Sequence, residues 1–389
     1  MKRARRASLL AQLTASEARV TPACTVVERC GGCPIAHAPR AMQIEAKRTW
    51  VLETWKEHGL DPSATELEVA APEPASGYRL RTRLAWARTK NAPSAAIGYR
   101  EGDAREVITP ERCVVLDARL EHARARLTDA LAPILVGTGE LRLGLSLAGD
   151  RAGATCAFDS PDAQSPAFYT QLEALRLAGV LLGARVKVGG ASIATTIGEP
   201  RERSLDPDGR SLVAPIGGFR QAHVEAASAL GSRVIAWGRP EGLDVIELHA
   251  GHGHFTLSLA SRARSLLAVE IDREATDTLR ENLGTHGLTA DVRAEDATQA
   301  LDRVVKDVRA KRRGAPDLVV LDPPRTGARD ETTRLEALAP ARIVYVSCDP
   351  DTFARDAARL SRTVPLRRVA LLDLFPDTLH TELVALFAR

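Results

Sequence analysis

The stretch "VIELHAGHGHFTLSLA", residues 245–260, contains an apolar run, a glycine-rich turn and a segment with helical spacing. Gly251 and Gly253 let the backbone of the turn pass close to a ligand where a side chain would clash. A second apolar run, "LLAVEID", ends in Glu270, which can accept both hydroxyls of a ribose. Thr256 stands where a phosphate-binding fingerprint would have its third glycine. The pattern favours a ligand with a ribose but no pyrophosphate, such as S-adenosylmethionine.

The residues around this turn alternate between strand and helix patterns. The apolar runs "LDVIEL", "SLLAVEI", "DLVVLD", "RIVYVSC" and "ELVALFA" are separated by helical segments, the first of which begins at about residue 220. Such alternation predicts a parallel sheet covered on both faces, that is, a Rossmann-like α/β domain. The Pro- and Gly-rich stretch "SLDPDGRSLVAPIGGF" precedes it, so we expect the domain to span 216–389.

Two of these runs end in residues that can carry chemistry. "DLVVLDPPRTG" places Asp322 at the end of a strand, before two prolines that stiffen the loop. "IVYVSCDPDTFARD" places Cys348 at the end of another, where a thiol can be exposed and activated. A buried, inert cysteine is the commoner alternative. Beside a methyl donor, a thiolate could add to carbon 6 of a uracil and make carbon 5 nucleophilic. Glu382 could then remove the carbon-5 proton, with His380 nearby.

The preceding region, 24–215, is expected to form a separate α+β domain. Residues 40–59 have helical spacing, and "YRLRTRLAWAR" (78–88) alternates with a period of two. Its basic face carries Arg79, Arg81 and Arg83, and 95–108 resembles a hairpin partner. This basic face is suited to phosphates.

Three cysteines, Cys24, Cys30 and Cys33, cluster in "CTVVERCGGCPIAH" with the spacing C-x5-C-x2-C. Structural disulfides are unlikely in a reducing compartment, so the cluster predicts a metal site. Cys113 is the best candidate for a fourth ligand and His37 the second. The residues alone leave both an iron–sulfur cluster and a zinc site open.

Composition restricts the remaining possibilities. The 389 residues carry a net charge of +3, and no apolar run is long enough to span a membrane. The first residues form no convincing secretory signal, so we expect a cytoplasmic protein. Residues 1–23 are basic and are expected to form a tail, either suited to phosphates or simply solvated and disordered.

Taken together, these motifs resemble the S-adenosylmethionine-dependent RNA uridine-5-methyltransferases of tRNA and ribosomal RNA. The resemblance runs from about Cys24 to the C-terminus, and the "LDPPRTG" and "VSCDPDTFARD" segments match closely. It implies Cys348 as the nucleophile and Glu382 as the general base. "CTVVERCGGCPIAH" resembles the cluster-binding motif of the ribosomal RNA branch, which implies a 4Fe-4S cluster. The implied ligands of the cluster are Cys24, Cys30, Cys33 and Cys113.

The resemblance also implies the cofactor contacts. Gln221 lies in "GFRQAHVEA", which is similar to the family's Phe-x-Gln segment, and "ELHAGHGHFTL" is similar to its Asp-Leu-Phe-Cys-Gly-x-Gly-x-Phe turn. The positions implied to contact S-adenosylmethionine are Gln221, His249, His254, Glu270 and Asp322. This sequence departs from the pattern at the turn, where His249 replaces Phe or Tyr, Ala250 replaces Cys, and His254 replaces Asn or Gly.

The function implied is methylation of carbon 5 of a uridine in structured RNA, with 23S ribosomal RNA as the expected substrate. The alternatives are a tRNA uridine-5-methyltransferase and a noncatalytic iron–sulfur RNA-binding protein. We expect a monomer that lacks the TRAM RNA-binding barrel of many members, because only 23 residues precede Cys24. RNA would then contact the basic tail, the arginine face and the cluster region.

Overall fold

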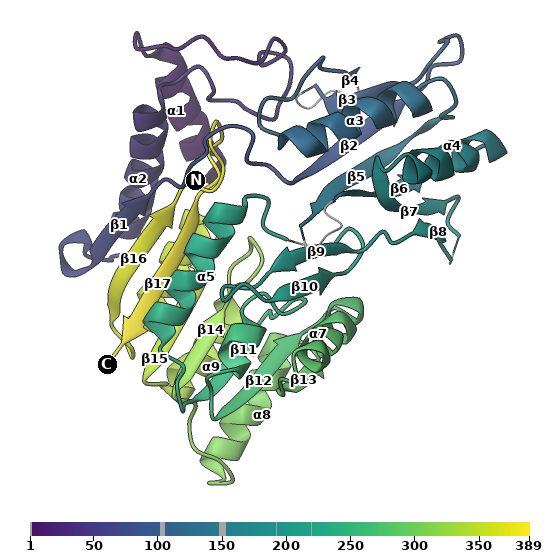
Figure 1. The fold of residues 1–389 in the computed structure, drawn as a ribbon. Helices are drawn as coiled ribbons and strands as arrows, with labels where there is room; N and C mark the ends of the chain where they lie inside the picture. Colours follow the sequence, from purple (N-terminus) through teal and green to yellow (C-terminus); the bar gives the residue numbers. More distant parts are fainter. Residues whose placement is uncertain (1, 102–105, 148–152, 192, 219) are drawn as a thin grey trace.

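The computed structural model describes residues 2–101, 106–147, 153–191, 193–218 and 220–389. Phe219 of the Phe-x-Gln segment and residues 102–105 of the expected hairpin therefore lie outside the described residues. The chain forms two large sheets, with a two-stranded ribbon near the junction between them (Figure 1). Among the described residues, no helix has the length and apolar character needed to cross a bilayer.

The larger sheet has eight strands and is built mainly from the C-terminal half of the chain. Its order is β1 (Glu66–Ala70), β16 (Leu366–Leu372), β17 (Glu382–Ala388), β15 (Arg342–Ser347), β14 (Leu318–Leu321), β11 (Asp244–Leu248), β12 (Ser265–Glu270) and β13 (Asp291–Ala294). Strands β11 to β15 pair in parallel. This confirms the expected α/β arrangement of βα units.

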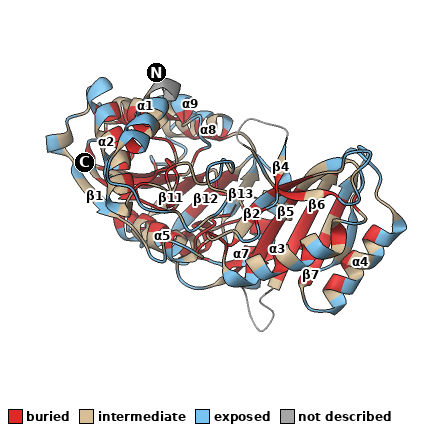
Figure 2. Ribbon diagram, turned by 90° about the horizontal axis from the view of Figure 1, so that it is seen from above, coloured by how far each residue is buried: buried red, intermediate tan, exposed pale blue. Residues whose placement is uncertain are grey.

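Helices cover both faces of this sheet, because residues alternate between the two faces of each strand. One face packs against α2 (Arg40–Glu57), α8 (Ala297–Arg309), α9 (Arg329–Leu338) and α10 (Pro350–Leu360). The other packs against α5 (Val224–Gly238), α6 (Thr256–Ala260) and α7 (Arg273–Thr285). Figure 2 shows the buried residues concentrated along the strands between these helices.

The sheet differs from a purely parallel one at its β1 edge. β17 runs antiparallel to both β15 and β16, so the expectation that every strand is parallel is wrong here. The physical reason is the short connection from β16 to β17, since a parallel crossover would need a dozen or more residues. β1 pairs with β16 although it precedes residue 216, so the sheet takes a strand from outside the expected catalytic segment.

The smaller sheet occupies the region from 81 to 198. Its order is β4 (Val107–Ile108), β3 (Ala96–Arg100), β2 (Arg81–Ala87), β5 (Thr138–Ser146), β6 (Gly153–Ser160), β7 (Leu181–Val188) and β8 (Thr195–Gly198). Helices α3 (Ala118–Leu131) and α4 (Pro166–Leu177) pack with its apolar residues. β9 (Glu202–Leu205) and β10 (Ser211–Ala214) form the ribbon, and a short 3-10 turn, η1, spans Pro62–Ala64.

The N-terminal residues are not a tail. Lys2–Ala15 form a helix, α1, and Leu9 and Leu13 are buried against Ile35, Trp50 and Leu379. The expectation of a solvated basic tail over 1–23 is therefore wrong for this part. Because Leu9 and Leu13 are four residues apart, their side chains lie on one face of α1, and this apolar face packs against the rest of the protein.

Candidate functional site

The glycine-rich turn connects β11 to α6 at the carboxyl ends of the parallel strands. Gly253 has φ 104° there, and a Cβ atom on it would lie 2.5 Å from the Leu279 side chain, so the position requires glycine. His249 has φ 60° at the end of β11, a left-handed conformation that ordinary residues seldom adopt. The backbone of this turn is thus held in an unusual shape at the sheet edge where ligands bind.

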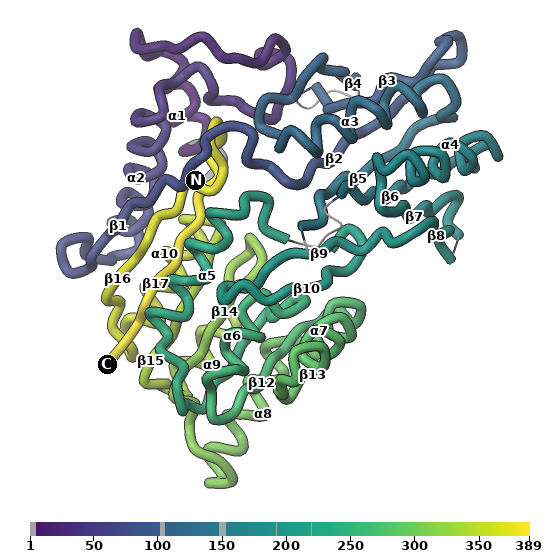
Figure 3. The backbone as a smooth tube through the Cα atoms, in the orientation of Figure 1, coloured from purple at the N-terminus to yellow at the C-terminus, as the bar shows by residue number. Residues whose placement is uncertain are grey.

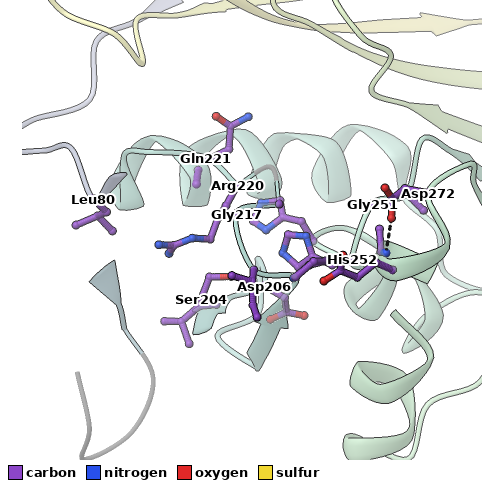
Figure 4. A pocket seen from close by; sticks show the side chains of 18 of the residues that line it. Leu80, Ser204, Asp206, Gly217, Arg220, Gln221, Gly251, His252 and Asp272 are labelled. Carbon is purple, nitrogen blue, oxygen red and sulfur yellow. Dashed lines mark hydrogen bonds between the residues drawn. The ribbon is translucent and has the colours of Figure 1, made fainter. Parts of the chain in front are cut away.

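A cavity of about 730 Å³ opens beside the turn and reaches the smaller sheet. This volume is within the usual range for a small-molecule site. Figure 4 shows Arg220, His252 and Asp206 converging on its interior, with Leu80 at one end and Asp272 at the other. All five residues expected to contact the cofactor line this one cavity: Gln221, His249, His254, Glu270 and Asp322.

Glu270 is fixed in place at the end of β12. Its Oε2 accepts a hydrogen bond from the Gly251 amide at 3.0 Å, and its Oε1 accepts one from the Asp272 amide at 2.8 Å. Each carboxylate oxygen can accept a further hydrogen bond. The carboxylate is therefore oriented to receive two hydroxyl donors, as a ribose would present.

The turn carries two buried histidines, His252 and His254, whose Nε2 atoms lack hydrogen-bond partners within the described part of the chain. Burial lowers the pKa of His252 to about 3 and that of His254 to about 4, so both imidazoles are neutral at pH 7. Buried polar atoms of this kind are normally satisfied, so a ligand or a water molecule has to supply the missing hydrogen bonds. Together with Glu270, they fit S-adenosylmethionine.

Cys348, Glu382 and Asp322 are brought together at one edge of the sheet, where β14 and β15 end and the antiparallel strand β17 begins. In the pairing of β15 with β17, Ser347 lies opposite Leu383, so Cys348 and Glu382 occupy the next position of the register. Asp322 follows β14, the other neighbour of β15. Cys348 is half-buried and free of any disulfide, so it is neither fully inert nor fully open to solvent.

Burial raises the pKa values of all three groups, and neighbouring carboxylates raise those of Cys348 and Glu382 further. Burial, followed by the charges of Glu382 and Asp322, raises the pKa of Cys348 to about 11, while Arg325 opposes this rise. Burial and then Asp322 hold the pKa of Glu382 well above its usual range, and burial raises that of Asp322 to about 6. Crowded acidic groups with shifted pKa values are typical of sites that transfer protons.

Arg325 and His380 complete the surroundings of this trio. Arg325 Nη2 lies 3.3 Å from His380 Nδ1, and the pKa of His380 is lowered to about 4 by burial and then by Arg325. Glu247, in β11, is also buried, which raises its pKa to about 8. Arg325, Glu247 and His252 were not among the predicted site residues. Their positions within the "LDPPR" and "ELHAGHG" motifs were the available signals.

The four cysteines of the expected cluster come from two separate segments. All four are free and half-buried. Burial raises the pKa of Cys33 to about 12, with Asp377 and then the thiols of Cys113, Cys30 and Cys24 adding to the rise, so the four thiols are electrostatic neighbours. No three potential ligands among the described residues are close enough to hold a metal ion. The structure thus brings the four thiols into one region without forming a closed metal site.

Comparisons with known proteins agree with this geometry. The chain has the fold of a tRNA (uracil-54, C5)-methyltransferase from Pyrococcus abyssi in complex with S-adenosyl-L-homocysteine, with a TM-score of 0.69, 22% identity, and coverage of 92% of this chain and 86% of that one. The chain therefore has the α/β fold of an S-adenosylmethionine-dependent methyltransferase.

The family follows from sequence. Residues 217–389 match the family model described as tRNA (Uracil-5-)-methyltransferase. The chain is 31% identical to the 23S rRNA (uracil(1939)-C(5))-methyltransferase RlmD of Alkalilimnicola ehrlichii, over 95% of this chain and 83% of the relative. It is 32% identical to the RlmD of Chromohalobacter salexigens, over 100% of this chain and 80% of the relative. The chain belongs to the RNA uracil-5-methyltransferase family.

Proposed function

We propose that this enzyme methylates carbon 5 of a uridine in 23S ribosomal RNA through a covalent bond from Cys348 to carbon 6 of the base. The observation that carries the proposal is the position of Cys348 beside Glu382 and beside Asp322, which lines the cofactor cavity. The full-length relatives named for uracil 1939 of 23S rRNA support ribosomal RNA as the substrate.

Cys348 begins the reaction by adding its sulfur to carbon 6 of the flipped uridine, which makes carbon 5 an enolate nucleophile. Bound S-adenosylmethionine supplies the methyl group, and Gln221, His249, His254, Glu270 and Asp322 would hold it. After carbon 5 carries the methyl group, Glu382 takes the carbon-5 proton. The electrons of that C–H bond re-form the 5,6 double bond, and the Cys348 sulfur leaves.

The reaction needs Cys348 as a thiolate and Glu382 as a carboxylate, so the protonation states of these two groups in the free protein matter. In the free protein the raised pKa values favour the neutral thiol of Cys348 and the protonated form of Glu382. Arg325 favours the charged form of both groups, because it lowers both pKa values. We therefore assign Arg325 the role of stabilising the thiolate and the carboxylate that the reaction needs.

An arginine row on the smaller sheet is the proposed RNA-binding face. Strand register places Arg83 beside Arg142, and Arg142 and Arg185 flank Ala157 on the face opposite α3 and α4. Arg142 and Arg185 also line the cofactor cavity, so the row leads toward the site. Phosphate contacts of this kind supply affinity without reading sequence.

The predicted Arg79, Arg81 and Arg83 face is corrected in part by this arrangement. Arg81 is largely buried, and its Nε lies 3.1 Å from Glu202 Oε2, a carboxylate that it shares with Arg220. Arg83 is exposed and pairs with Glu140. Arg142 and Arg185, from strands that were not assigned to the face, continue it instead.

A 4Fe-4S cluster held by Cys24, Cys30, Cys33 and Cys113 is also part of the proposal. Four thiols of the right type share one region, and a cationic cluster would relieve the mutual repulsion of their thiolates. Its role would be to tie the N-terminal segment to the smaller sheet. Metal analysis of protein purified without oxygen tests this: about four irons with equal sulfide support it, and zinc without iron refutes it.

A methyl-transfer assay tests the function. Its substrate is RNA purified from a strain that lacks this gene. We expect 5-methyluridine at one site of 23S rRNA, located by mass-spectrometric mapping. 5-Methyluridine in tRNA alone would favour the tRNA enzyme. No methyl transfer, with S-adenosylmethionine binding intact, would favour a noncatalytic RNA-binding protein.

A further inference from the structure

Helix α1 contacts both segments that carry the proposed catalytic residues. It lies outside residues 217–389, which match the family model. Figure 3 shows the purple N-terminal helix beside α2 and close to the yellow loop that leads into β17. A helix distant in sequence from Cys348 and Glu382 is therefore packed against their supporting elements.

The first contact is polar and reaches the start of α10. Arg5 Nη1 donates to Asp351 Oδ1 at 2.6 Å, and Trp50 Nε1 of α2 donates to Asp351 Oδ2 at 3.2 Å. Asp351 lies in the first turn of α10, three residues after Cys348. Both carboxylate oxygens of Asp351 are thus held from outside the catalytic turn.

Arg5 is itself held firmly. Its guanidinium also pairs with Glu57 and lies 3.7 Å from Glu53 through Nε, and only 10% of its side chain is exposed. Burial and three carboxylates restrict it to one geometry, unlike an ordinary surface ion pair, which contributes little. Arg5 therefore joins α1, α2 and α10 at one point.

The second contact is apolar and reaches the segment before β17. Leu9 and Leu13 pack in one cluster with Trp50 and Leu379, and Leu379 is 2% exposed. Leu379 precedes Glu382 by three residues. Helix α1 thus contacts the start of α10, just after Cys348, through Arg5. It contacts the segment just before Glu382 through Leu9 and Leu13.

We propose that α1 is a positioning element that fixes Cys348 relative to Glu382, with Arg5 as its main positioning residue. The inference rests on the proposed function, because it assigns α1 a role in the covalent reaction. Misplacement of a reacting group by about 1 Å can reduce a rate by up to about a hundredfold. The packing of α1 is therefore expected to act on turnover and not on cofactor binding.

The test compares the wild type with Arg5→Gln, Arg5→Lys and Arg48→Gln. Arg48 forms an exposed pair with Glu45 on α2 and serves as the matched control. The substrate is RNA containing 5-fluorouridine, which traps the methylated Cys348 adduct because fluorine cannot leave as a proton does. The rate of adduct formation, the dissociation constant of S-adenosylmethionine and the unfolding midpoint are measured for each protein.

We expect Arg5→Gln to slow adduct formation about tenfold at saturating RNA, with cofactor affinity unchanged and partial rescue in Arg5→Lys. Arg48→Gln should match the wild type. An unchanged adduct rate in a folded Arg5→Gln would overturn the inference and leave the proposed function standing. No adduct in the wild type would instead overturn the proposed function. If Arg5→Gln does not fold, Leu13→Ala decides by the same measurements.

Discussion

Cys348 and Glu382 lie at the same end of the antiparallel pair β15–β17, one position beyond the pairing of Ser347 with Leu383. Side chains at directly opposed positions of such a pair are neighbours, so the strand register brings a thiol and a carboxyl group together. β17 has to run antiparallel for this to occur. In a parallel arrangement, Glu382 would begin its strand at the opposite edge of the sheet.

The raised pKa of Cys348 predicts how this thiol reacts in the free protein. A pKa of about 11 means that the reactive thiolate is scarce at pH 7 and increases as pH rises. The rate of alkylation at Cys348 by iodoacetamide should therefore rise about tenfold per pH unit from pH 7 to 9, followed by peptide mass spectrometry. Asp322→Asn should increase the rate at pH 8, since it removes a negative charge. A rate that levels off below pH 8 would contradict this.

Glu270 is predicted to govern cofactor affinity. Glu270→Gln removes the charge and one of the two acceptors that face the ribose, so S-adenosylmethionine should bind about ten- to a hundredfold more weakly. Isothermal titration calorimetry of the folded variant measures this. Glu45→Gln, at an exposed position of α2 paired with Arg48, is a matched control that should bind as the wild type does. Equal affinities for Glu270→Gln and the wild type would refute the assignment.

The arginine row is predicted to contribute to RNA affinity in a salt-dependent manner. Arg142→Gln and Arg185→Gln should each weaken RNA binding and reduce the slope of log affinity against log salt by roughly 0.7 to 1. Arg312→Gln, which removes an exposed pair with Asp307 elsewhere, should leave the slope unchanged. Filter binding at several salt concentrations measures these slopes. Identical slopes for the wild type and the three variants would contradict the assignment.

The buried contact between Lys47 and Asp373 is predicted to stabilise the larger sheet. Lys47 is fully buried, donates to Phe375 O at 3.0 Å and pairs with Asp373, which Arg40 also contacts. Lys47→Met should lower the free energy of unfolding by about 3 kcal/mol, because it leaves a buried carboxylate partly unpaired. Urea denaturation measures the loss. A change below about 1 kcal/mol, the usual value for an exposed pair, would show that this contact is not important for stability.

The sequence predicted the elements whose signals are local. The turn with Gly251 and Gly253, Glu270 at a strand end, and Asp322 before two prolines were each visible as short patterns, and the structure places all of them at one cavity. Helix 40–59 is confirmed as α2 and the alternation in 78–88 as β2, because periodicity reports which face is buried. The segments that pair with β2 or pack against α2 were harder to predict from such local patterns.

What the sequence did not predict depends on contacts between distant segments. The pairing of β1 with β16 joins residues about 300 positions apart, and no local pattern marks it. Arg5 looked like part of a solvated basic tail, because its three carboxylate partners lie on α2 and α10. The direction of β17 likewise follows from a short loop and not from the residues of the strand.

The central claim is tested most directly by incubating Glu382→Gln with unmodified ribosomal RNA and S-adenosylmethionine, followed by peptide mass spectrometry. Because this variant lacks the base that removes the carbon-5 proton, the account predicts a Cys348 peptide linked to a methylated uridine, which Cys348→Ala should abolish. Methyl transfer at the wild-type rate by Cys348→Ala, or an adduct on another cysteine, would contradict it.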